Sequence, residues 1–206
     1  MRTIVLPGDL ISNKIEKGSG IYIQNNRTYS QYVGVLYKDR ICQVVPLQGK
    51  YAPKEGDLII GVIAQEDLFG YVIDVKSYHM PYVPKKSIKT EFKVGDLILC
   101  QVVSVNEIKD MIIDIQAKLN DGALFSVSAK KVPRIIGKHR SMINLLEKYS
   151  GSKILVGANG YLFVKGGKPN VVKEAVDIIS KYSQTENLTV KLESYLKKIN
   201  VSSGVD

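Results

Sequence analysis

The stretch Val132-Pro133-Arg134-Ile135-Ile136-Gly137-Lys138-His139-Arg140-Ser141 decides the fold of the chain. An Ile-Gly pair is followed at once by basic residues, and an apolar-periodic stretch over 142–149 comes directly after them. Proline at position 133 suits the first turn of a short helix. The start of the next helix presents unpaired backbone N–H groups, which favour an anion, and Lys138 and Arg140 add positive charge there. The stretch therefore predicts a phosphate-binding loop between two helices.

The sequence on both sides of this loop has the periods of further regular elements. Apolar residues recur at i, i+3, i+4 and i+7 in the two helical stretches, and Gly151 follows the first of them as a C-cap. Gly157-Ala158-Asn159-Gly160 lies between two apolar runs and is a hairpin signal. The predicted order is strand, short helix, Gly loop, helix, strand, strand, helix, with strands at 123–128, 153–156 and 161–164 and long helices at 142–149 and 170–182.

This order resembles a KH domain of the eukaryotic-type topology, an RNA-binding module whose Gly loop clamps the nucleic-acid backbone. The usual loop is Gly-x-x-Gly, whereas Arg140 stands here in the place of the second glycine. An arginine there can pair with phosphate or can block the close approach that glycine allows, and we expect a contact. The alternative to a KH domain is an ordinary α+β domain in which the basic residues form a turn without a binding role. The residues expected to bind RNA in this domain are Arg134, Gly137, Lys138, His139 and Arg140.

Composition and charge support a polyanionic partner. The chain has 206 residues, of which 45% are hydrophobic, and carries a formal net charge of +9. Its length fits two or three domains, each able to bury a core. Basic residues outnumber acidic ones by fourteen to six in 122–206 and by seven to three in 1–52, but the middle, 53–121, has eight against eleven. The positive excess is therefore concentrated around the Gly loop, where it favours nucleic acid.

The middle of the chain has the pattern of short β-strands. Gly-Asp-Leu-Ile occurs three times, at residues 8–11, 56–59 and 95–98, and each time a Gly-Asp turn opens an apolar, strand-like run. This punctuation resembles an S1 domain, a five-stranded barrel of the OB type that binds single strands on an aromatic face. Because the segment is net negative, some of its aromatics can instead belong to the barrel core. The residues expected on the RNA face are Phe69, Tyr71, Tyr78, His79, Lys85 and Lys86.

The order of the domains resembles the S1/KH cap proteins of the RNA exosome, most closely their archaeal form. The resemblance rests on Leu6-Pro7-Gly8-Asp9, on the segment from Val44 to Asp57, and on the Val-Pro-Arg-Ile-Ile-Gly opening of the KH domain. It implies a multidomain chain, mainly β plus α+β. The expected parts are a small N-terminal β domain over 1–52, an S1 barrel of the OB type over 53–121, and a KH domain with an additional C-terminal helix over 122–206.

The resemblance also implies a role. Such a protein is a non-catalytic subunit, present in three copies, that helps to guide the 3′ end of single-stranded RNA into a hexameric ring of RNase PH-like subunits. The N-terminal domain is expected to dock on the ring. A free-standing RNA-binding regulator or chaperone built from the same modules is the alternative. The residues expected at the ring contact are Leu6, Pro7, Gly8, Asp9 and Tyr51.

The residues themselves give no sign of catalysis, of a metal or of a cofactor. The two histidines have no carboxylate or cysteine at useful spacing. The pairs Asp110/Asp114 and Glu66/Asp67 are better explained as polar residues of solvated turns and strand faces than as metal ligands. No apolar run is long enough for a signal peptide or a membrane span, so a cytoplasmic, membrane-free protein is expected. An amphipathic helix is predicted over 186–201, to pack on the KH domain or on a partner.

Overall fold

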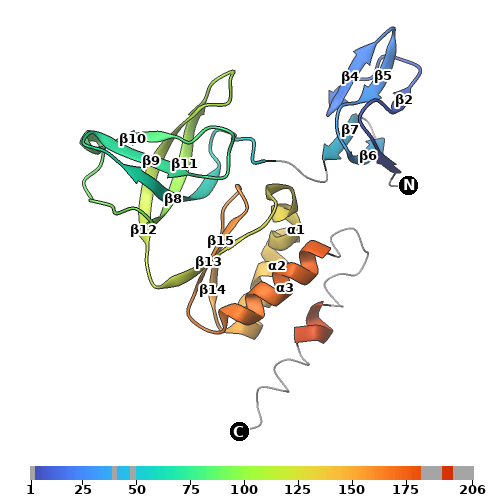
Figure 1. Ribbon diagram of the computed structural model, residues 1–206. Helices are drawn as coiled ribbons and strands as arrows, with labels where there is room; N and C mark the ends of the chain where they lie inside the picture. The colour runs from blue at the N-terminus through green and yellow to red at the C-terminus, as the bar shows by residue number, and fades with distance from the viewer. Residues whose placement is uncertain (1–2, 39–40, 47–49, 182–191, 197–206) are drawn as a thin grey trace. The chain divides into compact units, whose positions relative to one another are not determined.

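The computed structural model of the chain describes residues 3–38, 41–46, 50–181 and 192–196. The chain divides into two compact units, Met1–Gly49 and Lys50–Asp206. Fifteen strands and a few helices are assigned in the described ranges (Figure 1). The predicted class, a multidomain protein of β and α+β parts, is confirmed.

The first unit is built of two small sheets. Their strand orders are β1-β6-β7-β3 and β2-β5-β4. Four buried residues, Val5, Ile11, Cys42 and Val44, form its hydrophobic core. A core this small is typical of a unit that is stabilised in part by a neighbour. The strands are β1 (Thr3–Val5), β2 (Leu10–Ser12), β3 (Gly18–Ser19), β4 (Ile21–Gln24), β5 (Arg27–Ser30), β6 (Gly34–Lys38) and β7 (Cys42–Pro46).

Strand β5 is one element that the sequence pattern did not predict. It pairs with β4 through a tight turn at Asn25-Asn26, where both residues have positive φ angles of 49° and 59°. Asparagine tolerates this left-handed backbone better than most side chains, so the pair can form the two-residue turn of a hairpin. The sequence pattern missed this strand because its buried positions, Thr28 and Ser30, have hydrophilic side chains and so give no apolar alternation.

The three Gly-Asp repeats fold into the same turn, as predicted. In each one the glycine has a positive φ angle, between 84° and 94°, and the aspartate side chain accepts a hydrogen bond from the backbone N–H three residues earlier. A strand begins directly afterwards, because the turn leaves Leu-Ile in extended backbone. The three turns contain Gly8-Asp9 before β2, Gly56-Asp57 before β8, and Gly95-Asp96 before β11.

The second unit begins with the predicted five-stranded barrel. Its strands are antiparallel in the order β10-β9-β8-β11-β12. The edge strands β10 and β12 contact each other, which closes the sheet into a barrel. The inner face is a dense apolar core that includes Ile59, Ile73, Ile98 and Cys100, each fully buried. The elements are β8 (Leu58–Glu66), β9 (Gly70–Asp74), β10 (Tyr82–Pro84), the 3-10 turn η1 (Lys85–Ser87), β11 (Leu97–Val105) and β12 (Met111–Leu119).

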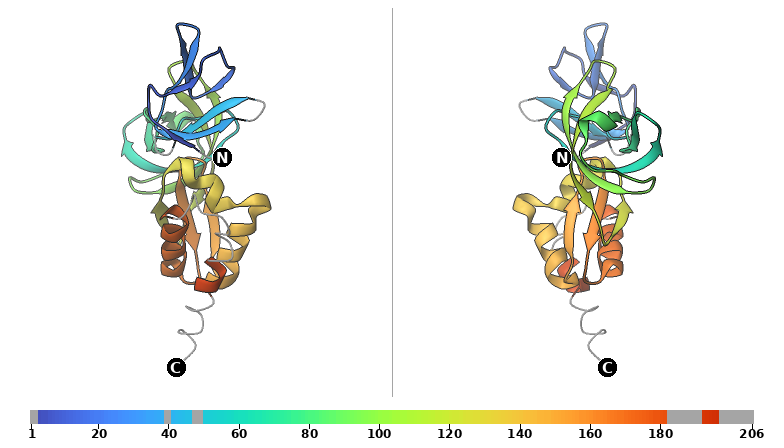
Figure 2. Two further views of the ribbon diagram at one scale, coloured as in Figure 1. Left: turned by 90° about the vertical axis from the view of Figure 1, so that its right-hand side faces the viewer. Right: turned by 90° about the vertical axis from the view of Figure 1, so that its left-hand side faces the viewer.

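The predicted KH order follows directly after β12. A three-stranded antiparallel sheet, in the order β13-β15-β14, carries the helices on one face (Figures 1 and 2). Helix α2 ends at a left-handed Gly151 (φ 66°), whose N–H donates to the Glu147 carbonyl, so the predicted cap is confirmed. The elements are β13 (Gly122–Ser126), η2 (Ala129–Lys131), α1 (Val132–Ile136), η3 (Lys138–Arg140), α2 (Ser141–Ser150), β14 (Lys153–Val156), β15 (Tyr161–Lys165) and α3 (Pro169–Lys181).

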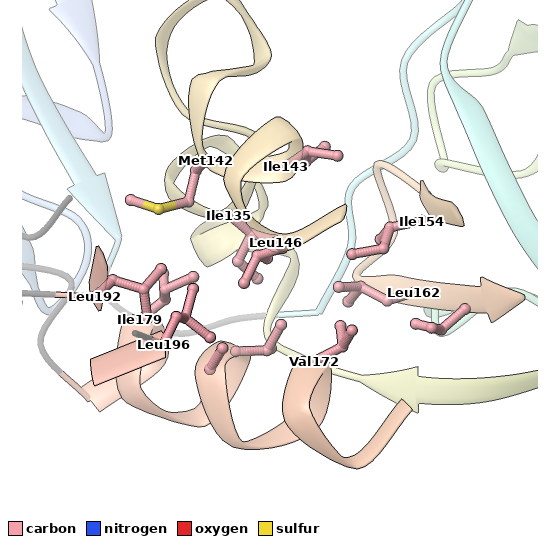
Figure 3. Packing of buried hydrophobic residues seen from close by; sticks show 13 residues of the cluster. Ile135, Met142, Ile143, Leu146, Ile154, Leu162, Val172, Ile179, Leu192 and Leu196 are labelled. Atoms are coloured by element: carbon pink, nitrogen blue, oxygen red, sulfur yellow. The ribbon is translucent and has the colours of Figure 1, made fainter. Parts of the chain in front are cut away.

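Part of the predicted C-terminal helix belongs to the KH core. Residues 192–196 are helical, and Leu192 and Leu196 are buried among the side chains of α2 and α3. Figure 3 shows the two leucines beside Ile179, with the Met142 side chain extending toward Leu192. The described turn therefore packs on its own domain. The rest of the prediction for 186–201 lies outside the described residues.

The outer face of the KH sheet packs on the outer face of the barrel. Phe163 and Tyr161 of β15 are buried against Ile60 of β8, and leucines of both domains surround them. Gly157 is required at this contact, because a Cβ there would lie 2.9 Å from the backbone nitrogen of Ile60. The hairpin between β14 and β15 is also bonded to the barrel, since the Ala158 N–H donates to the Leu58 carbonyl at 2.8 Å.

Asn159 locks this contact with its side-chain amide. The residue is fully buried, and its Oδ1 accepts the Ile60 N–H at 3.3 Å. Its Nδ2 donates to the carbonyls of Ile60 and Val75, at 2.6 and 3.0 Å. A buried amide with three partners from the other domain fixes position and orientation at once, because each unmade bond would leave a polar group desolvated. The barrel and the KH domain are thereby joined by a specific hydrogen-bonded contact.

Replacing Asn159 by alanine should destabilise the second unit strongly. The change leaves polar groups of Ile60 and Val75 buried without partners, which costs about 1–3 kcal/mol and lowers the denaturation midpoint. Asn144→Ala is the matched control, because Asn144 is exposed on α2 and its loss should be neutral. Chemical denaturation of the full chain measures both. Equal midpoints for the two variants would contradict the role given to the amide.

Candidate nucleic-acid interface

The KH loop has a backbone geometry that only some residues adopt easily. Gly137 has φ 72° and ψ 170°, and a Cβ there would come within 2.8 Å of the Met142 backbone nitrogen. His139 and Arg140 follow in the left-handed region, with φ angles of 51° and 62°. Arg140 thus adopts, at some cost in strain, the conformation that the usual glycine adopts freely.

Helix α2 starts from this loop without a side-chain cap. Arg140 is its N-cap residue, and no acidic residue stands in its first turn. The N–H groups of that turn therefore have no side-chain acceptor at the cap, and they lie beside the exposed side chains of Lys138, His139 and Arg140. The Ser141 N–H already donates to the Lys138 carbonyl. The remaining N–H groups of a first turn without a side-chain cap, next to positive charge, form a local environment suited to a phosphate.

Five cations without an acid stand between residues 130 and 140. Arg134, Lys138 and Arg140 are exposed, and Lys130 and Lys131 are half-buried. None of the five forms an ion pair with any residue that the structure describes, although four such pairs occur elsewhere in those ranges. Their charge is consequently available to a ligand.

On the barrel, Phe69 is the most exposed of the predicted aromatics. Its ring is 74% exposed, in the turn between β8 and β9. Asp67 holds this turn, because its Oδ1 accepts the N–H groups of Phe69 and Gly70, each at 2.7 Å, and the Tyr82 hydroxyl at 3.0 Å. The two backbone bonds are the main cause of the lowered pKa of Asp67. Asp67 is therefore a structural carboxylate of a turn, as the sequence indicated.

Tyr71 corrects the sequence-based prediction for this face. Its ring is 1% exposed and packs edge-on against Phe92, with the ring centres 5.7 Å apart. The hydroxyl accepts the Phe92 N–H at 3.2 Å. A buried ring cannot stack on a base, so the prediction that Tyr71 binds RNA is wrong. Alternation along β9 places it on the inner face of the barrel.

Lys85 and Lys86 differ in how much charge they offer. The Lys85 ammonium donates to Glu66 at 2.8 Å and lies 5.2 Å from the centre of the Tyr71 ring. The bond to Glu66 raises the pKa of Lys85, and the same bond offsets its charge. Lys86 is exposed and has no ion pair with a described residue. Of the two predicted contacts, Lys86 is the freer cation.

Tyr78 and His79 lie in the loop between β9 and β10. The Tyr78 ring is 68% exposed, with the Lys50 ammonium 5.0 Å from its centre. His79 Nδ1 lies 3.3 Å from Asp110 Oδ1, so the histidine contacts the loop between β11 and β12. In the described ranges no three His, Cys, Asp or Glu side chains gather closely enough to hold a metal ion.

Tyr51 corrects the prediction for the ring contact. The residue belongs to the second unit, is 5% exposed, and packs in the barrel core. Its hydroxyl donates to Asp57 Oδ2 at 2.6 Å, and burial raises the pKa of the phenol. Tyr51 is unsuited to a contact surface because its side chain is already covered. Leu6, Pro7, Gly8 and Asp9 are exposed.

The fold and its basic loop place the chain among the KH proteins. A KH family model matches residues 123–181, and the model described as the exosome RNA binding protein RRP4 N-terminal domain matches residues 2–48. The exosome complex component Rrp4 of Methanothermus fervidus is 33% identical over 95% of both chains. The chain belongs to the Rrp4 family, which confirms the resemblance seen in the sequence.

Other relatives agree with this assignment. The exosome complex component Rrp4 of Thermoplasma acidophilum is 33% identical over 97% of this chain and 92% of its own length, and that of Sulfolobus acidocaldarius is 32% identical over 96% and 89%. A crystal structure described as an exosome complex RNA-binding protein shares the fold with a TM-score of 0.67, at 24% identity, over 73% of this chain and 97% of its own. In the described part of this chain no helix has the length and apolarity to cross a membrane.

Arg140→Gly should stabilise the KH domain. Glycine removes the strain of the left-handed residue, and the gain exceeds the extra entropy of the unfolded chain by about 0.5–1 kcal/mol. Arg140→Ala removes the charge but keeps the backbone strain, so it separates the two effects. Thermal denaturation of both variants is the measurement. A glycine variant no more stable than the alanine variant would show that the loop is unstrained.

Proposed function

We propose that the chain is a non-catalytic RNA-binding subunit of an exosome, which captures single-stranded RNA for degradation by other subunits. The observation that carries this proposal is the KH loop, where the exposed cations Lys138 and Arg140, which form no ion pair with a described residue, precede a helix start without a side-chain cap. The relatives that match nearly the whole chain are named exosome complex components, which favours this reading over a free-standing regulator. In the ranges that the structure describes, no arrangement of chemistry-bearing residues suggests an activated nucleophile.

The barrel supplies a second kind of contact. Phe69 and Tyr78 present exposed rings, onto which bases can stack without regard to sequence, while the KH cations attract phosphates. Gly137, Lys138, His139, Arg140 and Arg134 would hold the backbone, and Phe69, Tyr78, His79, Lys85 and Lys86 would line the barrel face. Binding of this kind is strongly salt-dependent and tolerant of sequence, which suits a subunit that must accept many RNAs.

The first unit is suited to docking on another protein. Its core has four buried residues, whereas a larger set of apolar side chains is exposed. Apolar surface on so small a unit favours burial against a partner. We propose that this partner is a hexameric ring of RNase PH-like subunits, that three copies of the chain bind it, and that the assembly works in the cytoplasm. The exposed set is Ile4, Leu6, Leu10, Ile15, Tyr22, Ile23, Tyr32, Val33 and Ile41.

The two RNA surfaces should respond differently to salt. Lys138→Ala with Arg140→Ala should weaken RNA binding evenly across sequences and flatten the plot of log affinity against log salt by about one to two units. Phe69→Ala should leave that slope unchanged and cost about 1–3 kcal/mol, if the ring stacks on a base. Filter-binding titrations with an unstructured RNA at several salt concentrations measure both effects.

Lys148→Ala with Lys173→Ala is the charge-matched control for this titration, because both lysines are exposed on the KH helices away from the loop. The RNA recovered from every titration should be full-length, since the chain is proposed to bind and not to cleave. Wild-type slope in the Lys138/Arg140 variant, or tighter binding by Arg140→Gly, would remove Arg140 from the contact surface.

Charges placed on the first unit should abolish ring association. Leu6→Glu with Ile41→Glu puts carboxylates on two side chains that are 56% and 64% exposed, so the fold should survive while the docking surface is lost. Size-exclusion chromatography with a ring of RNase PH-like subunits is the measurement. Leu68→Glu, at an apolar position of the barrel that is 87% exposed, should still co-elute. Co-elution of the doubly charged variant would exclude this face as the docking surface.

A further inference from the structure

The contact between barrel and KH domain brings charged and aromatic residues of both domains together. Lys76 of the β9–β10 loop reaches into the KH domain, where its ammonium donates to Ser126 Oγ at 2.5 Å and to the Val127 carbonyl at 2.7 Å. The same ammonium lies 5.2 Å from the centre of the Tyr161 ring. Burial lowers the pKa of Lys76, as expected for a cation enclosed by a protein contact. Lys76 therefore holds the loop in place, and its own donors are engaged.

Two lysines follow this contact on the KH side, and they do not make the hydrogen bonds across it that Lys76 makes. Lys130 and Lys131 stand in η2, three and four residues after Val127, and Ala129 of the same turn packs against the barrel core. Neither lysine has an ion partner among the residues that the structure describes. The turn that carries both lysines therefore lies at the contact with the barrel, through the packing of Ala129.

On the barrel side, the same loop presents Tyr78. Its ring is 68% exposed, two residues after the anchored Lys76, and Lys50 lies 5.0 Å from it. Ser77 Oγ donates to the Tyr51 carbonyl at 3.4 Å, so the loop is also tied to the segment that carries Lys50. Asp74, an acid of this contact, accepts hydrogen bonds from the Tyr161 hydroxyl and the Lys76 N–H.

An exposed ring with surrounding cations is the combination that single-stranded nucleic acids require, since the base stacks and the phosphates pair. We propose that the junction of the two domains is an RNA-binding site of its own, in which a base stacks on Tyr78 while Lys50, Lys130 and Lys131 hold the flanking phosphates. Neither domain contains this set alone. The inference rests on the proposed function and adds a path for the RNA between Phe69 and the KH loop.

The test is a binding titration of the full chain with an unstructured RNA long enough to span both domains. Lys130→Ala with Lys131→Ala should flatten the salt dependence by about 1.4 units and weaken binding on the order of tenfold at about 0.1 M salt. Lys130→Arg with Lys131→Arg should restore both, because the charges return. Tyr78→Ala should weaken binding about 5- to 150-fold with an unchanged slope, whereas Tyr78→Phe keeps the ring and should bind normally.

The outcomes separate this inference from the proposed function. If the wild-type chain does not bind RNA, the proposed function fails and the junction fails with it. If the wild type binds and Lys138→Ala with Arg140→Ala weakens it, but the Lys130/Lys131 variant matches the Lys148/Lys173 control, the junction site alone is overturned. Denaturation midpoints of all variants show whether any loss reflects unfolding. A normal midpoint with the expected slope change supports the junction.

Discussion

The side-chain amide of Asn159 is the interaction on which the arrangement of the second unit depends. It makes three hydrogen bonds to backbone groups of the barrel while fully buried, and no slipped arrangement of the two domains could satisfy the same groups. The apolar contact around Phe163 and Ile60 supplies area without direction. The amide supplies the direction, and it thereby sets the register in which barrel and KH domain present their ligand surfaces.

This register explains why the RNA-binding features belong to the unit and not to separate modules. The ammonium of Lys76 crosses the same contact, so the exposed loop of the barrel and the basic turn of the KH domain have fixed relative positions. A ligand that contacts both the barrel loop and the basic turn binds a preorganised surface. The free-energy cost of ordering the protein on binding is therefore reduced. Strain at His139 and Arg140 fits the same picture, since left-handed residues persist only where neighbouring structure holds them.

The sequence predicted the periodic parts of the molecule well. The KH order, the cap at Gly151 and the Gly-Asp turns all follow from local chemistry, so their patterns can be read without a structure. The predictions for Tyr71 and Tyr51 were wrong, because composition does not say which face of a barrel a ring occupies. Asn159 was read only as part of a hairpin signal, since its partners lie 84 and 99 residues away. Long-range contacts of this kind have no local signature.

The burial of Leu192 and Leu196 has a consequence for how the protein matures in the cell. The recognisable KH segment ends at residue 181, yet its core is completed by side chains made later. During synthesis, domains fold in order from the N-terminus. We therefore expect the barrel to form first and to serve as a template for the KH sheet. The KH domain closes last, when residue 196 has emerged, so premature termination before that point leaves a nascent chain with an exposed apolar surface for quality control to detect.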